Sequence, residues 1–283
     1  MDDIRFSFIT TDGQETKVSI SITQRVIDLK EQNIAEIDLS SFEKGFNIEK
    51  IDLSRNHISE FDLTPLGQLK RLQWLDISHN DLSNIDLLQF GRYPSLQRLS
   101  LSYNPITQID LSPLETWLHL NTLRMTKLDL DELDISQLRN CTELEELSLA
   151  FNNLKSINLN HLNTCSNLLI LSLNKNRLKV IDLHPLSACT KLRTLNLGMN
   201  KLETINLSPL STCEKLYSLT LRENMLKEID LAPLANLQNL RGLDLRDNRL
   251  VSIDLRPLRY YHLFEMLDYS GNPLENIALP SIE

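Results

Sequence analysis

The sequence predicts an α/β fold: a curved solenoid, or horseshoe, of short coils with a parallel β-sheet on its concave face. An asparagine recurs every 24 residues, leucines recur at fixed offsets around it, and the residues before it alternate in polarity as in a β-strand. A single coil of this kind cannot bury its own apolar side. Neighbouring coils must therefore stack, and the repeats stabilise one another.

The asparagines keep one register along almost the whole chain: Asn56, Asn80, Asn104, Asn152, Asn176, Asn200, Asn224, Asn248 and Asn272. Counting back 24 residues from Asn56 reaches Gln32, in the otherwise matching VIDLKEQNIAEIDL. We expect eleven repeats over residues 24–283, the last one truncated, as a single continuous domain. The amides should form a structural ladder that pairs backbone groups of neighbouring coils. Leu128 interrupts this ladder, which we interpret as sequence drift with a local distortion; a hinge or a partner-specific contact is the alternative.

One repeat, from Leu192 to Lys215, reads LRTLNLGMNKLETINLSPLSTCEK. It resembles the leucine-rich-repeat family in its 24-residue class, with an IDLxPL variant segment similar to repeats of archaeal and bacterial proteins. The resemblance covers residues 24–283 and implies a recognition scaffold, adaptor, inhibitor or regulator.

The first half of each repeat should be a short strand. In LSLSYN, Leu99 and Leu101 are expected to point into the core, and Ser100 and Ser102 to point outward. Stacked at about 4.8 Å, such strands make the parallel sheet.

The second half should lie on the convex face. Ile205, Leu207 and Leu210 are expected to fill the far side of the core. Ser208-Pro209 indicates a hydroxyl cap followed by proline at the first position of a single helical turn, often 3₁₀.

The two ends differ from the repeats. Residues 4–22 alternate in polarity around Asp12-Gly13, so we expect residues 1–23 to form an N-terminal β-hairpin cap. At the other end, the aromatic segment RYYHLFEMLDY caps the last coil, or the chain continues in a longer protein, or two copies pair through their ends.

Charge and composition exclude several classes of protein. A net charge of -9 and a pI of about 5.2 disfavour nucleic acid and membrane surfaces as partners. The N-terminus lacks the pattern of a secretory signal, and no stretch is apolar enough to span a membrane. We therefore expect a cytoplasmic protein.

All four cysteines, Cys141, Cys165, Cys189 and Cys213, share one repeat position. Elsewhere this position holds Leu69, Tyr93, Trp117, Leu237 and Tyr261. A column of bulky apolar residues indicates burial, so we expect buried reduced thiols. Neither a metal site nor a cofactor is predicted, because ligands in a row do not converge on a point.

An acidic column accompanies the second half of the repeats: Asp38, Asp62, Asp86, Asp110, Asp134, Asp182, Asp230 and Asp254, with Asn158 and Asn206 in equivalent places. Tolerance of asparagine favours local Asx turns over a calcium ladder. His57, His79 and Asp81 could form a surface metal site, but this pattern is weak and we predict no bound metal.

Function should lie in outward strand positions, because no structural role fixes them. Large apolar and arginine side chains are enriched in protein-binding hot spots. The candidate partner-binding residues on the concave face are Trp74, Arg98, Tyr103, Arg124, Phe151, Ile170 and Met199.

We therefore predict a protein–protein interaction scaffold that is not an enzyme. No nucleophile–base motif, phosphate loop or dinucleotide motif is found in the sequence. The alternative is the recognition arm of a larger enzyme or signalling protein whose activity lies outside this chain. Further native sequence would favour that alternative, and activity of the isolated chain would favour an enzyme. The sequence identifies neither the partner protein nor the oligomeric state.

Overall fold

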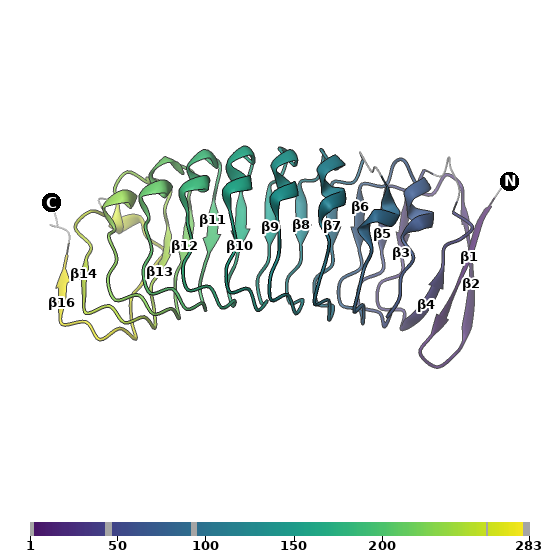
Figure 1. Cartoon of the computed structure of the whole chain (residues 1–283), viewed down its shortest axis with the longest axis horizontal. Coiled ribbons are helices and arrows are strands. Elements are labelled where there is room, and N and C mark those ends of the chain that lie inside the picture. Colours follow the sequence, from purple (N-terminus) through teal and green to yellow (C-terminus); the bar gives the residue numbers. More distant parts are fainter. Residues whose placement is uncertain (1–2, 43–46, 92–94, 259, 280–283) are drawn as a thin grey trace. The chain divides into compact units, whose positions relative to one another are not determined.

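The computed structural model describes residues 3–42, 47–91, 95–258 and 260–279, without the side chain of residue 261. The chain divides into two compact units, Met1–Leu130 and Asp131–Glu283. Within each unit, successive coils stand side by side in chain order, with a short strand in each coil and a 3₁₀ turn in most of them (Figure 1). Leu128, the break in the asparagine register, lies two residues before the end of the first unit.

The first unit begins with the predicted hairpin. Strand β1 (Asp3–Thr10) pairs antiparallel with β2 (Glu15–Ser21), and Gly13 adopts a φ of 81° in the turn between them. A third strand, β4 (Ile34–Asp38), pairs with the other side of β1 and comes from the first repeat. Hairpin and first repeat thus share one sheet, a pairing that the sequence did not predict. That residues 1–23 act as a cap on residues 24–283 stays a prediction.

The parallel strands of the first unit are β3 (Val26–Asp28), β5 (Lys50–Asp52), β6 (Trp74–Asp76), β7 (Arg98–Ser100) and β8 (Thr122–Arg124). Partners are 24 residues apart, as between Trp74 and Arg98, so equivalent residues line up in columns. The 3₁₀ helices are η1 (Thr64–Gln68), η2 (Leu87–Phe90) and η3 (Ser112–Thr116).

The second unit repeats this pattern. Its parallel strands are β9 (Glu146–Ser148), β10 (Ile170–Ser172), β11 (Thr194–Asn196), β12 (Ser218–Thr220), β13 (Gly242–Asp244) and β15 (Met266–Asp268). Its 3₁₀ helices are η4 (Ser136–Asn140), η5 (Asn160–Thr164), η6 (His184–Ala188), η7 (Ser208–Thr212), η8 (Ala232–Leu234) and η9 (Tyr261–Leu263). A separate parallel pair joins β14 (Ser252–Asp254) to β16 (Asn276–Ala278).

The core is built as predicted, apart from three side chains. Leu99 and Leu101 are fully buried. Ser100 and Ser102, expected to face solvent, keep an exposed fraction of only 7% each. Ile205, expected in the core, is half-buried.

The acidic column forms the predicted Asx turns. The Oδ1 atom of Asp110 accepts a hydrogen bond from the Ser112 N–H at 2.8 Å, and Asn206 does the same for Ser208 at 3.0 Å. The predicted hydroxyl cap is wrong, because the cap position is taken by the preceding leucine, Leu111 or Leu207, and no side chain makes a cap hydrogen bond there. The Ser112 hydroxyl also donates a hydrogen bond of 2.8 Å to the second carboxylate oxygen of Asp110.

The asparagine amides connect neighbouring coils. Asn176 donates to the carbonyls of Leu149 at 2.9 Å and Leu173 at 3.0 Å, and accepts from the Leu154 N–H at 3.0 Å. These buried backbone groups would otherwise lack partners. At the break in the register, Leu128 is buried like a core residue, with 1% exposed.

The cysteine column is buried, and its four cysteines form no disulfide. Loss of solvent raises the pKa of Cys141 and Cys189 to about 12 and that of Cys165 and Cys213 to about 11. The Cys189 thiol donates to the Leu162 carbonyl at 3.4 Å. Leu69, Trp117 and Leu237 are buried in the same column, as expected. Tyr93 and the side chain of Tyr261 lie outside the described residues.

Candidate functional site

The candidate site lies on what we call the strand face: the outward positions of the parallel strands and the turn residue that precedes each asparagine. Apart from Gly271, which precedes Asn272, the residues of this turn column have a left-handed backbone, with φ between 52° and 59°, although they are not glycine: Glu31, Arg55, His79, Tyr103, Lys127, Phe151, Lys175, Met199, Glu223 and Asp247. Such φ values are unusual for bulky residues and persist only where the surroundings impose them. The side chains of this turn column therefore project at the ends of the strands, where the chain bends.

In the first unit, Trp74 lies between two cations. The Lys50 ammonium is 3.4 Å from the centre of the Trp74 ring, and the Arg98 guanidinium is 6.0 Å from it. Both are within the range of cation–π attraction. Lys50 also forms an ion pair with Asp52 at 3.6 Å, so its charge is neutralised. Trp74 is half-buried, whereas Arg98 is exposed.

The turn column of the first unit carries a second aromatic group. The rings of His79 and Tyr103 stack, with centroids 4.0 Å apart and planes 10° from parallel. The Lys127 ammonium lies 5.3 Å from the Tyr103 ring. Burial, followed by the positive charge of Arg55, lowers the pKa of His79 below its ordinary value. His79 is thus held neutral beside Tyr103, which keeps 39% of its surface exposed.

A hollow of about 400 Å³ lies beside this stack, lined among others by His57, Asp81, Lys127 and Asp129. The Nδ1 atom of His57 lies 3.3 Å from an Asp81 carboxylate oxygen, both side chains being more than half exposed. The part of the chain that the structure describes contains no group of three or more histidine, cysteine or carboxylate side chains placed to hold a metal. His57 and Asp81 therefore form an exposed contact at hydrogen-bond distance.

The second unit places different groups at the same positions. Phe151, with 36% of its surface exposed, lies beside Lys175, whose ammonium is 4.7 Å from the ring centre. Met199 accepts a hydrogen bond at its sulfur from Arg222 at 3.8 Å. Ile170 is half-buried on β10.

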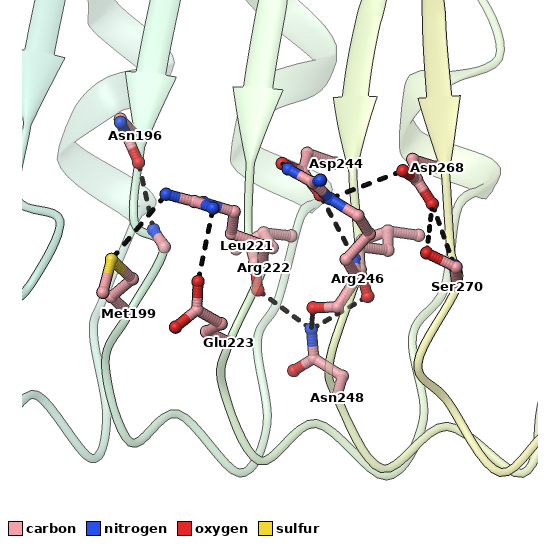
Figure 2. A network of polar contacts seen from close by, with 12 residues as sticks. Asn196, Met199, Leu221, Arg222, Glu223, Asp244, Arg246, Asn248, Asp268 and Ser270 are labelled. Carbon is pink, nitrogen blue, oxygen red and sulfur yellow. Dashed lines mark hydrogen bonds and ion pairs between the residues drawn. The ribbon is translucent and has the colours of Figure 1, made fainter.

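Further along the second unit, the arginines are tied to carboxylates. Arg246 makes hydrogen bonds of 3.0 and 2.8 Å with the two oxygens of Asp244, and its Nε atom is 3.4 Å from Asp268. Asp244 is buried, and this pairing raises the pKa of Arg246. Figure 2 shows Arg246 between the two aspartates, and Arg222 reaching both Met199 and Glu223. The positive charges of Arg222 and Arg246 are therefore already paired with carboxylates of the same unit.

The structure thus puts all seven candidate residues on strand-face positions: Trp74, Arg98, Tyr103 and Arg124 in the first unit, and Phe151, Ile170 and Met199 in the second. Among these seven residues, Trp74 and Arg98 lie next to each other, within the range of cation–π attraction. Sequence reasoning missed the cations that rest on the aromatic rings, Lys50, Lys127 and Lys175, and the stacking of His79. The 24-residue register would have revealed these neighbours, since Lys50 and Trp74 are partners in adjacent strands.

Comparison with known families follows the repeat pattern. A family model described as "Leucine rich repeat" matches residues 25–82, 142–202 and 214–274, more than half of the chain. A second model, "Leucine Rich repeats (2 copies)", matches residues 70–115. None of the curated proteins compared with this chain matches it significantly in sequence. Among the described residues, no helix is both long and apolar enough to span a membrane.

Solved structures share the fold. The functional domain of InlJ from Listeria monocytogenes, described as including a cysteine ladder, superposes with a TM-score of 0.69 at 20% identity, over 93% of this chain and 65% of that one. The internalin InlF from the same species gives 0.68 at 23% identity, over 93% and 84%. The ectodomain of the Arabidopsis thaliana receptor kinase GASSHO1/SCHENGEN3, in complex with CASPARIAN STRIP INTEGRITY FACTOR 2, gives 0.72 at 25% identity, over 85% and 30%.

Proposed function

Because the chain belongs to the leucine-rich-repeat family, we propose that it is a scaffold that binds a partner protein through the strand face of its units. Domains of this family are generally interaction modules without catalytic activity, and the proposed function assigns this chain no catalytic step, cofactor or metal. One observation carries the proposal. The repeat columns that build the core are nearly uniform, whereas the strand face gathers aromatic, methionine and arginine side chains, the types enriched in binding hot spots.

The GASSHO1/SCHENGEN3 structure supports this function, since its description records a complex with another molecule. Within the proposal, the first unit contributes Trp74, Arg98, Tyr103 and Arg124, and the second contributes Phe151, Ile170 and Met199. A cytoplasmic location is part of the same proposal. The four free cysteines support it, and cell fractionation tests it.

The experiment is capture of partners from extract of the native cell on the immobilised chain. A first-unit variant carries Trp74→Ala and Tyr103→Ala, and a second-unit variant carries Phe151→Ala and Met199→Ala. The control variant carries Leu118→Ala and Val180→Ala, which remove exposed apolar side chains outside the strand face, 52% and 68% exposed. Circular dichroism verifies that each variant is folded.

A protein retained by the parent and the control but lost from either strand-face variant supports the proposal and identifies the partner. Equal retention by all four proteins places recognition elsewhere and overturns it.

The second candidate function is the recognition arm of a larger enzyme or signalling protein. The length of the structural relatives favours it, because this chain spans 65% of the InlJ chain and 30% of the GASSHO1/SCHENGEN3 chain. The intact mass of the protein isolated from its native cell decides between the two. A mass near 32.6 kDa favours the independent scaffold, and a larger mass favours the arm.

A further inference from the structure

The strand face of the first unit contains a basic strip within an acidic protein. Segments 97–103 (QRLSLSY) and 121–127 (NTLRMTK), which contain β7 and β8, hold Arg98, Arg124 and Lys127 but no aspartate or glutamate. The whole chain has a net charge of -9. We call Arg98, Arg124 and Lys127 the basic strip. A concentration of one charge sign against the net charge of the molecule indicates a surface selected for a ligand of opposite sign.

Two cations of the strip lack the carboxylate partners that neighbouring cations have. On earlier coils of the same unit, Lys50 pairs with Asp52 at 3.6 Å and Arg55 with Glu31 at 3.4 Å. Across the described ranges of the chain, no carboxylate lies within ion-pair distance of Arg98 or Lys127. Both cations are therefore available to a ligand anion.

Aromatic rings position these two cations. Arg98 lies 6.0 Å from the Trp74 ring, and Lys127 lies 5.3 Å from the Tyr103 ring. A long side chain held against a ring loses less conformational freedom when it binds an anion, which favours affinity. The exposed part of Tyr103 also offers an apolar surface next to the charge. A ligand that fits must carry carboxylates and at least one apolar side chain.

The surroundings of the strip limit how long an acidic ligand can be. The outward position of β6 carries Asp76, and Asp129 lies two residues after Lys127. A polyanion that extended past the strip would meet these carboxylates and be repelled. A short run of acidic residues avoids them, whereas a nucleic-acid strand has a charge at every nucleotide.

We propose that the basic strip, with Trp74 and Tyr103, binds a short acidic segment of the partner protein in extended form. The inference rests on the proposed function and specifies its chemistry. The carboxylates of the segment pair with Arg98 and Lys127, and its apolar side chains contact the two aromatic rings. We expect the affinity for the acidic segment to fall as the salt concentration rises, because dissolved ions screen the attraction between exposed charges.

The test uses the full chain and a random-sequence peptide library. The parent is expected to select peptides enriched in aspartate and glutamate together with aromatic or aliphatic residues. The most frequent peptide is labelled, and its affinity is measured by fluorescence anisotropy for the parent, Arg98→Glu, Lys127→Glu and Arg71→Glu. Arg71→Glu makes the same charge change in the same unit at an exposed position outside the strand face.

We expect Arg98→Glu and Lys127→Glu each to weaken binding at least about tenfold and Arg71→Glu to leave it unchanged. The inference is overturned if the parent selects peptides without acidic enrichment, or if the two strip variants bind the acidic peptide as the parent does. It is also overturned if oligothymidylate of equal charge binds more tightly than the peptide and is lost in the same variants, since the site then recognises nucleic acid.

Failure of this inference is distinguishable from failure of the proposed function. If the peptide result is negative while partner capture is still lost in the Trp74→Ala, Tyr103→Ala variant, the strand face binds a partner of different chemistry. If capture is indifferent to every strand-face variant, the proposed function itself is wrong.

Discussion

The two units have the same scaffold but different strand faces. Asn104 in the first unit and Asn176 in the second make equivalent hydrogen bonds to two carbonyls and one N–H. On the strand face of the first unit, the Arg98 guanidinium lies 6.0 Å from the centre of the Trp74 ring. On that of the second unit, Arg246 forms ion pairs with both Asp244 and Asp268. The backbone fixes the inward columns, since a change there leaves buried groups unpaired. The outward columns are free of that constraint, so their differences report function.

The largest difference we expect between the units is their response to alkali, because all four cysteines are in the second unit. Their pKa is raised from the ordinary 9.0 to about 11 or 12 by burial. The folded state therefore keeps protons that the unfolded state loses above pH 9.0, and stability falls as pH rises from there. We expect a loss of about 1.4 kcal/mol per cysteine at pH ~10, or about 5–6 kcal/mol for the four.

Urea unfolding at neutral pH and at pH ~10 measures this loss. The control is the variant with Cys141, Cys165, Cys189 and Cys213 replaced by alanine, which should lose much less stability on the same change of pH. An equal loss in parent and control would show that the thiols are not responsible.

The ladder provides a test of whether the two scaffolds are equivalent. Asn104→Ala and Asn176→Ala each leave a buried N–H and two carbonyls without the amide, so each should lower the free energy of unfolding by about 2–4 kcal/mol. Asn163→Ala, at an exposed position, is the control. Urea unfolding followed by far-UV circular dichroism measures all three. A clearly smaller loss in one unit would contradict the view that the scaffolds are the same.

Most of the scaffold was predictable because it repeats. The strands, the 3₁₀ turns and the Asx turns follow from residue types at a constant spacing, and the repeated register averages out local exceptions. The exceptions are features that do not repeat. Pairing of β4 with β1 depends on where the hairpin folds back, and the pairing of β14 with β16 occurs in one place.

The site was predicted less completely, for a physical reason. A left-handed backbone normally indicates glycine, but the turn column contains Tyr103, Phe151 and Met199, so nothing in their side chains indicates the bend. The side-chain contacts between neighbouring coils could not be predicted from the sequence either. Whether a cation such as Lys50 or Lys127 rests on a ring or on a carboxylate depends on side-chain direction, which residue spacing alone does not determine.

Two arginine–aspartate pairs of the second unit test whether burial determines how much such a pair contributes to stability. Arg246 donates two hydrogen bonds to the carboxylate of Asp244. Arg256 likewise donates two hydrogen bonds, of 2.9 and 2.7 Å, to the carboxylate of Asp254. The Asp244 side chain is 4% exposed, whereas that of Asp254 is 46% exposed. Asp244→Asn should lower stability by about 1–2 kcal/mol, because a buried charge-assisted bond is lost. Asp254→Asn should have a smaller effect, since water screens that pair.

Thermal or urea unfolding of both variants gives this comparison. If Asp254→Asn cost as much as Asp244→Asn, burial would not be what makes the Arg246 network structural.

The smallest expected effect concerns His79, whose counterpart positions in the second unit hold no histidine. Its pKa is lowered by burial and then by the charge of Arg55, so its midpoint in an NMR titration should lie below the ordinary ~6.5. Arg55→Gln removes a neighbouring positive charge and should move the midpoint upward. Lys179→Gln, which removes an exposed charge of the second unit, should leave it unchanged.

Because the folded state disfavours the proton, this histidine stabilises the fold above pH ~6.5 and its contribution is lost as pH falls. Below its midpoint, protonated His79 adds a positive charge to the ring that stacks on Tyr103. Binding of an acidic peptide should therefore strengthen as pH falls toward that midpoint, and His79→Gln should remove this dependence. If the strengthening persisted in His79→Gln, another group of the protein would be its source, because protonation of the peptide's carboxylates on acidification weakens binding to the basic strip. The stack would then serve only to hold Tyr103 in place.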